Sequence, residues 1–263
     1  MMNMINGRSG HRLMLALTAL TSLLIAGCDL PASKAIDQAA FDAGEQLAIN
    51  GREGVIACTA CHGANGEGNW DTGFPRLAGL HPTYLVKQLN DFAGDPLDIG
   101  VDLEPIARDY VKTPRIYKDL TIYSPGIRTD AMMNDIGAAL TAEEKNNLAV
   151  YYSNLAFETS PIPADFQSLE RGLDLAQRGK PEYMMPRCDA CHAAKGQGFG
   201  ALFPPLAGQP PQYIISQINK WQSGERNNDN LSMMKNVATQ LTAGDKINIA
   251  KYYANQSYRV NME

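Results

Sequence analysis

The chain carries the same short pattern twice: two cysteines separated by two residues, with a histidine directly after the second. The copies are Cys58-Thr59-Ala60-Cys61-His62 and Cys188-Asp189-Ala190-Cys191-His192. Cysteines at this spacing can pair, bind a metal or attach covalently to haem. A histidine in the next position favours haem, because its imidazole can bind the iron. The sequence therefore predicts two covalently bound haem c groups.

Two other uses of the cysteine pairs are disfavoured. A structural zinc ion needs four ligands, and each copy of the pattern supplies only three. A thioredoxin-like dithiol belongs in a βαβ unit, and the sequence shows no alternating strand pattern.

The similarity between the two halves extends well beyond the cysteines. Each motif is followed by Phe-Pro-x-Leu-Ala-Gly, then a tyrosine, a pair of methionines, Leu-Thr and Tyr-Tyr. The first copy has 74–79, Tyr84, Met132-Met133, Leu140-Thr141 and Tyr151-Tyr152; the second has 203–208, Tyr213, Met233-Met234, Leu241-Thr242 and Tyr252-Tyr253. A repeat of this extent predicts two homologous domains.

Helices account for the periodic segments of both halves. We expect helices at 36–50 and 169–178 before the motifs, and at 82–92 and 211–221 after them, where proline stands near a helix start. A last helix begins at Thr141 or Thr242, and an acid three residues on, Glu144 or Asp245, resembles a capping box. The predicted fold class is all-α.

The domain limits follow from the repeat. We expect the first domain at 35–157, a linker at 158–168 and the second domain at 169–263. The interval from His62 to Met133 is much longer than that from His192 to Met234, and the excess lies at about 95–130. This insertion is either a surface segment without a specific role or a docking element beside the first haem.

The sixth iron ligand follows in part by elimination. Beyond the first 27 positions the chain has three histidines, His62, His81 and His192, whereas two bis-histidine haems need four. Methionine is the usual partner of histidine in electron-carrying haem proteins. Each half offers a methionine pair, and either member remains open. His81 stands where the second copy has Pro210, which favours a surface or capping role over ligation.

The arrangement resembles two class I cytochrome c domains in tandem, as in the di-haem cytochrome c4 family, over roughly 35–257. The resemblance implies that the ligand is the methionine seven residues before the leucine, which selects Met133 and Met234 over Met132 and Met233. The iron ligands would then be His62, Met133, His192 and Met234. The resemblance also implies that the carbonyls of Pro75 and Pro204 accept the ring N–H of the two histidines, which tunes their basicity.

The first 27 positions are typical of a signal peptide. They contain Arg8 and Arg12, no acidic residue and an apolar run at 13–25 that is short for a membrane span. Ile25-Ala26-Gly27-Cys28 resembles a bacterial lipoprotein signal, which predicts a lipidated Cys28 and a tether at 28–34. The alternative is a cleaved signal with a chance cysteine. Asp29 resembles an inner-membrane retention signal. We therefore expect a lipid-anchored protein on the periplasmic side of a bacterial membrane, with the inner membrane favoured.

These features together favour electron transfer over catalysis. Iron with both axial positions filled has no place for a substrate, so we expect no catalytic residue and no small-molecule substrate. The expected partners are a quinol-oxidising complex or dehydrogenase as donor and a terminal oxidase as acceptor. A dedicated subunit of a periplasmic dehydrogenase is the alternative, and a di-haem peroxidase or sulfur-compound oxidase is disfavoured. The formal net charge of −5 argues against nucleic acid.

Overall fold

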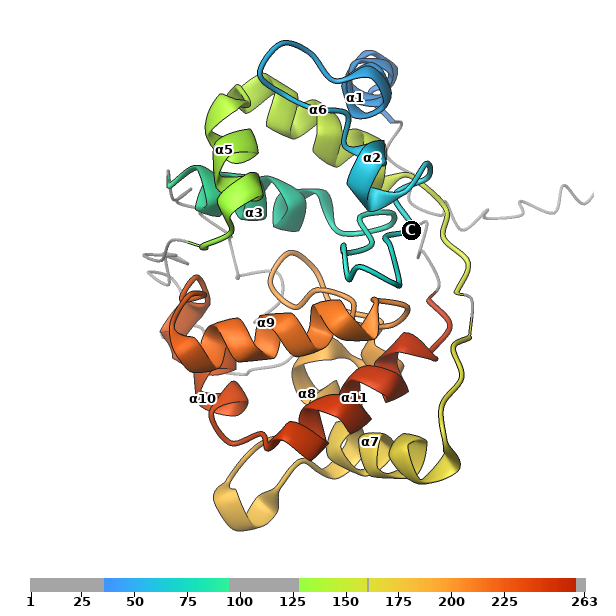
Figure 1. Ribbon diagram of the computed structural model, residues 1–263, viewed down its shortest axis with the longest axis vertical. Coiled ribbons are helices and arrows are strands. Elements are labelled where there is room, and N and C mark those ends of the chain that lie inside the picture. The colour runs from blue at the N-terminus through green and yellow to red at the C-terminus, as the bar shows by residue number, and fades with distance from the viewer. Residues whose placement is uncertain (1–35, 95–127, 160, 259–263) are drawn as a thin grey trace, which may run out of the picture. The chain divides into compact units, whose positions relative to one another are not determined.

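The computed structural model describes residues 36–94, 128–159 and 161–258. Within them the chain is helical, and β-structure is limited to isolated bridges. The first half has α1 (Gln38–Asn50), α2 (Thr59–His62), α3 (Pro82–Ala93), α5 (Ala131–Ala139) and α6 (Ala142–Ser153). The second half has α7 (Phe166–Arg178), α8 (Asp189–His192), α9 (Pro211–Ser223), α10 (Met233–Ala238) and α11 (Ala243–Ala254), with 3-10 turns at Pro181–Tyr183, Ala194–Gly196 and Asn230–Ser232 (Figure 1). The all-α prediction is confirmed.

Side-chain caps set where the predicted helices begin. The carboxylate of Asp37 accepts a hydrogen bond from the backbone N–H of Ala40 at the start of α1. Asp165 does the same for Ser168, at 2.8 Å, so α7 begins at Phe166. The expected start at 169 is therefore wrong by three residues, because this cap lies within the segment assigned to the linker.

Both capping boxes are confirmed. The Thr141 hydroxyl accepts from the Glu144 N–H at 3.2 Å, and the Thr141 N–H donates to the Glu144 carboxylate at 2.8 Å. Thr242 and Asp245 repeat this arrangement with the same two distances at the start of α11. The shorter aspartate therefore closes the box as well as glutamate does.

Each half is built on a close crossing of its first and last helices. α1 packs on α6, and α7 packs on α11. The crossings occur at Gly44 and Gly172, where an added Cβ would lie only 2.8 Å from Cβ of Tyr151 and 2.5 Å from Cβ of Tyr252. Glycine is required at both positions because no larger side chain fits between the helices.

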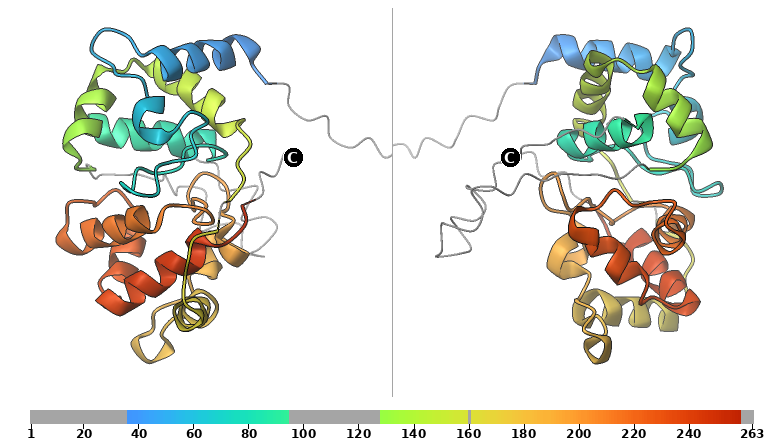
Figure 2. Two further views of the ribbon diagram at one scale, coloured as in Figure 1. Left: turned by 45° about the vertical axis from the view of Figure 1, so that its right-hand side comes forward. Right: turned by 90° about the vertical axis from the view of Figure 1, so that its left-hand side faces the viewer.

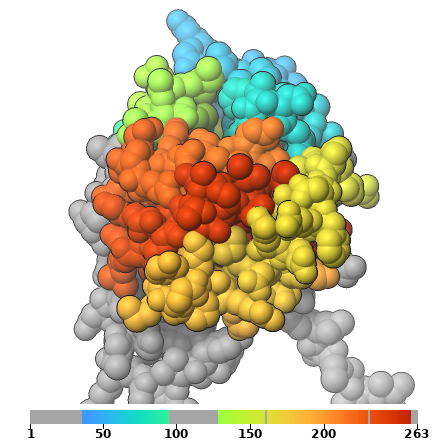
Figure 3. Space-filling view, turned by 60° about the horizontal axis from the view of Figure 1, so that its bottom comes forward, coloured from blue at the N-terminus to red at the C-terminus, as the bar shows by residue number. Residues whose placement is uncertain are grey.

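The two halves have separate hydrophobic cores. The first core includes Leu47, Val55, Leu80, Leu85, Leu140, Leu148, Tyr151 and Tyr152. The second includes Leu175, Met185, Ile214, Ile218, Trp221, Leu241, Ile249, Tyr252 and Tyr253. The tyrosine pairs of the last helices are thus buried in both halves. Figure 2 shows the two groups of helices from other sides. α11 contacts α7 and α9, and its surface is drawn in red in Figure 3.

A buried arginine joins the halves, which belong to one compact unit. Arg76 is fully buried and donates hydrogen bonds to the carbonyls of Ala78 in its own half and Ala207 in the other. Its guanidinium lies 4.8 Å from the ring centre of Phe157 and 4.2 Å from that of Tyr258. Burial lowers the pKa of Arg76 to about 10, so the group stays charged at neutral pH.

Several predicted features lie outside the described residues. These are the signal peptide, Cys28, Asp29, the tether and most of the 95–130 insertion, of which 128–130 are described. The domain limits stay a prediction. None of the helices in the described ranges is both long and apolar enough to cross a membrane.

Candidate haem sites

The first motif forms one helical turn at the edge of a cavity. The backbone N–H of His62 donates to the carbonyl of Cys58 at 2.9 Å, which brings Cys61 and His62 of α2 close to Cys58, the residue before this helix. The imidazole is buried, and its Nδ1 lies 2.9 Å from the carbonyl oxygen of Pro75. A carbonyl can only accept, so Nδ1 carries the proton and Nε2 keeps a lone pair for a ligand. Burial also lowers the pKa of His62, which favours the neutral ring.

The second motif repeats this geometry on α8. Nδ1 of the buried His192 lies 2.8 Å from the carbonyl oxygen of Pro204. Nε2 of His192 is buried and has no hydrogen-bond partner in the described part of the chain. Burial lowers the pKa of this histidine as well. A buried nitrogen with a lone pair and no donor is unusual, and a metal ion is one partner that would satisfy it.

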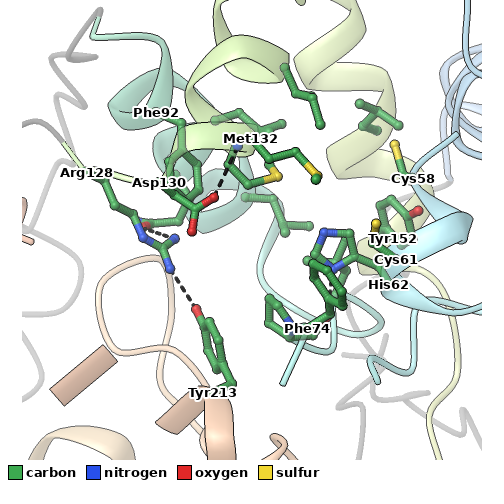
Figure 4. A pocket seen from close by; sticks show the side chains of 18 of the residues that line it. Cys58, Cys61, His62, Phe74, Phe92, Arg128, Asp130, Met132, Tyr152 and Tyr213 are labelled. Atoms are coloured by element: carbon green, nitrogen blue, oxygen red, sulfur yellow. Dashed lines mark hydrogen bonds between the residues drawn. The ribbon is translucent and has the colours of Figure 1, made fainter. Parts of the chain in front are cut away.

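A mostly apolar cavity of about 530 Å³ lies beside the first motif. The predicted residues of this half all line it: Cys58, Cys61, His62, Pro75 and Met133. α5 supplies the methionines, and Figure 4 shows Met132 and His62 entering from different elements. Met132 has 48% of its surface exposed, whereas Met133 is partly buried.

A second apolar cavity, of about 400 Å³, has the equivalent lining. The predicted residues are again together: Cys188, Cys191, His192, Pro204 and Met234. Met233 has 40% of its surface exposed, whereas Met234 packs against the core of its half. In both cavities the second methionine of the pair is the less exposed.

Each cavity also takes part of its lining from the other half. Leu80, Tyr84, Lys87 and Gln88 of the first half line the second cavity, and Tyr213, Ser216, Gln217 and Lys220 of the second half line the first. The helices α3 and α9 carry most of these residues. The side chains at the contact between the halves therefore also line both cavities.

The residues present fit haem c. The thiols of Cys58, Cys61, Cys188 and Cys191 are free, as covalent attachment requires. Each cavity offers an imidazole whose Nε2 is available, a methionine from another helix and an apolar interior of several hundred Å³. His81 lines neither cavity, and its Nδ1 accepts from the N–H of Thr83 at the start of α3. The capping role expected for it is confirmed.

Sequence reasoning missed a cluster of polar residues between the cavities. Arg128 and Arg226 are buried there with Gln88 and Gln217, and Figure 4 shows Arg128 reaching Tyr213. The sequence carried a signal for them, because Gly-x-Arg occurs at 126–128 and again at 224–226. The first of these lies within the 95–130 segment assigned to the insertion, and this assignment concealed the match.

Two sites of this composition in one helical chain define a di-haem c-type cytochrome, a protein of electron transfer. No family model matches the sequence. The chain is 35% identical over 208 residues to a thiosulfate dehydrogenase electron acceptor from Stutzerimonas stutzeri, covering 76% of this chain and 79% of that protein. It is 31% identical over 215 residues to cytochrome c4 from Azotobacter vinelandii, covering 81% and 90%. The chain belongs to the cytochrome c4 family.

Solved structures agree with this assignment. Reduced cytochrome c4 from Pseudomonas stutzeri is similar with a TM-score of 0.62 and 27% identity, over 82% of this chain and 98% of that one. A thiosulfate dehydrogenase from Marichromatium purpuratum is similar with a TM-score of 0.65 and 31% identity over 82% of this chain. The similarity spans only 40% of the Marichromatium chain. The tandem cytochrome c fold and the two haem c groups predicted from the sequence are thus confirmed.

Proposed function

We propose that both irons are held by one histidine and one methionine, His62 with Met133 and His192 with Met234. The carbonyls of Pro75 and Pro204 fix the two imidazoles, and the lower exposure of the second methionine in each pair supports the choice. Haem c supplies an iron that changes charge by one electron. With both axial positions filled, the protein moves electrons without binding a substrate at the metal.

We propose further that the electrons come from a dehydrogenase, with an enzyme that oxidises thiosulfate as the favoured donor. The observation that carries this proposal is the 35% identity to two proteins named thiosulfate dehydrogenase electron acceptor, from Stutzerimonas stutzeri and Thiomonas intermedia. A quinol-oxidising complex is the competing donor, and a terminal oxidase is the proposed acceptor.

The proposed location is the periplasmic side of a bacterial membrane. The support is the sequence of the first 29 positions, in which a basic and apolar leader precedes Cys28 and Asp29. Acyl chains on Cys28 would hold the carrier at the membrane, next to membrane-bound donors and acceptors. Metabolic labelling with a fatty acid tests this, since Cys28→Ala should remove the label and release the protein from membranes.

Rapid mixing tests the donor. The oxidised cytochrome is mixed with thiosulfate and with a thiosulfate dehydrogenase purified from the same host. Haem reduction is followed by absorbance. Reduction within the turnover time of the dehydrogenase supports the proposal. The control replaces the dehydrogenase with a quinol-oxidising complex and its quinol. Fast reduction by the quinol-oxidising complex alone would transfer the donor role to it.

A dedicated subunit of a dehydrogenase is the second candidate. One observation favours it: the similar region in Marichromatium purpuratum is 40% of a longer chain described as a thiosulfate dehydrogenase. A subunit should purify with its catalytic partner in a fixed ratio at physiological salt, whereas a free carrier should separate from it. The 95–130 insertion is the candidate interface, and deletion of only its 96–124 part, which keeps Arg128 and Asp130 in the lining of the first cavity, should then release the partner without changing the haem spectrum.

A further inference from the structure

One charged residue distinguishes the two haem motifs. Position 189, between the cysteines of the second motif, is aspartate, whereas the equivalent position 59 is threonine. Asp189 is the first residue of α8 and His192 is the last, so both belong to one helical turn. The second motif therefore carries a carboxylate within one turn of the histidine proposed to bind iron, and Thr59 offers no charge at this place.

Two hydrogen bonds hold the Asp189 side chain in place. One carboxylate oxygen accepts from the Tyr253 hydroxyl at 2.8 Å, and the other accepts from the backbone N–H of Lys195 at 3.3 Å. Burial raises the pKa of Tyr253, so the phenol keeps its proton and is the donor of the first bond. Asp189 is partly buried, and its charge is therefore screened less than that of an exposed side chain.

Tyr253 connects this carboxylate to the second cavity. The residue is fully buried and lines that cavity, while its hydroxyl reaches Asp189. Its ring has little freedom, since an added Cβ at Gly196 would lie only 2.6 Å from a ring carbon. A hydroxyl that donates to a carboxylate is polarised, so its oxygen carries more negative charge. The wall of the second cavity is therefore more negative at Tyr253.

The first half has the same tyrosine without this partner. Tyr152 is buried and lines the first cavity, and Figure 4 shows it on the same side of the cavity as Cys61 and His62. Within the described residues, no carboxylate accepts a hydrogen bond from the Tyr152 hydroxyl. Glu67 is a nearby acid, but its carboxylate accepts from the backbone N–H of Asn65 at 2.8 Å. The second cavity thus has a tyrosine bonded to a carboxylate where the first has the tyrosine alone.

Charge near a haem changes its reduction potential. Ferric iron carries one more positive charge than ferrous iron, so a negative charge nearby stabilises the ferric state and lowers the potential. We propose that Asp189, through the hydroxyl of Tyr253, lowers the reduction potential of the second haem. The first haem lacks this contribution, so the chain can hold two haems with the same kinds of ligand at different potentials. The inference rests on the two haem c groups and is independent of which protein donates electrons.

Redox titration of the purified holoprotein tests the role of the charge. Chemical mediators replace the physiological donor, and absorbance gives the two haem potentials. Asp189→Asn keeps the size of the side chain and removes its charge, so it should raise one potential and leave the other nearly unchanged. Thr59→Asp is the reciprocal change in the first half and should lower the other potential. Glu67→Gln is the matched control, because it removes an acid that is not bonded to the tyrosine, and its shift should be smaller than that of Asp189→Asn.

A double-variant cycle tests the role of the tyrosine. Tyr253→Phe keeps the ring and removes the hydroxyl, so it should raise the same potential as Asp189→Asn. Asp189→Asn should then have a smaller effect in the Tyr253→Phe protein than in the wild type.

Two further measurements show that a shift reflects charge. Thermal unfolding shows that each variant is folded, and the methionine-to-iron charge-transfer band shows that its haems keep their ligands. An Asp189→Asn protein with this band intact and both potentials unchanged would overturn the proposal. An equal effect of Asp189→Asn with and without the Tyr253 hydroxyl, or an equal shift in Glu67→Gln, would overturn the part assigned to the tyrosine.

Discussion

In the first half α1 crosses α6 at Gly44, and in the second half α7 crosses α11 at Gly172, so both helical frames depend on the same close approach. At the contact between the halves some equivalent positions are alike, such as Gln88 and Gln217, and others differ. Asp91 of α3 corresponds to Lys220 of α9, and Lys220 binds Asp130 of the first half at 3.0 Å. Aspartate at both positions would place like charges at the contact. The glycines at the helix crossings are therefore the same in both halves, whereas Asp91 and Lys220 have opposite charges.

The arginine that joins the halves follows the same rule. Arg76 corresponds to Pro205, so only one half sends a guanidinium across the contact. It donates to Ala78 and Ala207, which are equivalent residues of the two halves. A second arginine at 205 would compete for the same carbonyls. The two carbonyls that are joined are therefore equivalent in the repeat, whereas the arginine that joins them is present in the first half alone.

The largest effects are expected from the iron ligands, where the halves should behave alike. Met133→Ala and Met234→Ala should each remove about half of the methionine-to-iron charge-transfer band of the oxidised protein, since each strips one of two irons. Met132→Ala and Met233→Ala are the matched controls and should leave the band in place. If a control variant loses the band instead, the ligand of that half is its neighbour.

The helix crossings should also respond equally. Gly44→Ala and Gly172→Ala should each lower the free energy of unfolding by about 3 kcal/mol, because the new methyl group meets the facing helix. Denaturant unfolding measures this. Gly244→Ala in α11 is the control, since the nearest atom to an added Cβ is 3.9 Å away. It should stabilise the protein by up to about 1 kcal/mol, through the better helix propensity of alanine.

Substitutions at Arg76 and at its equivalent Pro205 should have unequal effects on the free energy of unfolding. Arg76→Met should lower the free energy of unfolding by about 2 kcal/mol, because the carbonyls of Ala78 and Ala207 lose their donor. Pro205→Ala in the other half should change it much less. The distinguishing measurement is proteolysis between the halves, at 158–164. Faster cleavage there in Arg76→Met indicates a loosened contact, and unchanged cleavage would argue against a joining role.

The smallest effect concerns pH and the two capping boxes. The hydrogen bond from Arg52 holds the pKa of Glu144 at about 2, below its ordinary value of 4.5. A lowered pKa stabilises the fold above pH 4.5, and that stability is lost as the pH falls toward 2. Glu144→Gln should cost at most about 1 kcal/mol at pH 7, and the cost should shrink as the pH falls from 4.5 through 2. In the second half burial opposes the shift, but the Lys180 ammonium group still lowers the pKa of Asp245, so Asp245→Asn should behave similarly.

The helices and the haem motifs could be predicted from residues that are close together in the sequence. The contact between the two halves could not. The helix starts at Thr141 and Thr242 depend on neighbours three residues away, and the cysteine motif is contiguous, so the sequence contains all that these features need. The grouping of Arg226 with Gln88, by contrast, depends on residues 138 positions apart. No periodicity links them, and the buried charge becomes visible only when α3 and α9 are placed together. The start of α7 was missed because its cap lies in a proline-containing segment that favours a linker.

The shared lining of the two cavities determines what can be learned from fragments of this protein. Each half has its own cysteines, histidine and methionines, but part of the lining of each cavity comes from the other half. An isolated half would therefore lack a complete haem cavity. A fragment of one half would leave one side of its haem open to water, and greater solvent access alters a haem potential. Spectra or potentials measured on an excised half would therefore describe a different redox centre from the one in the intact chain.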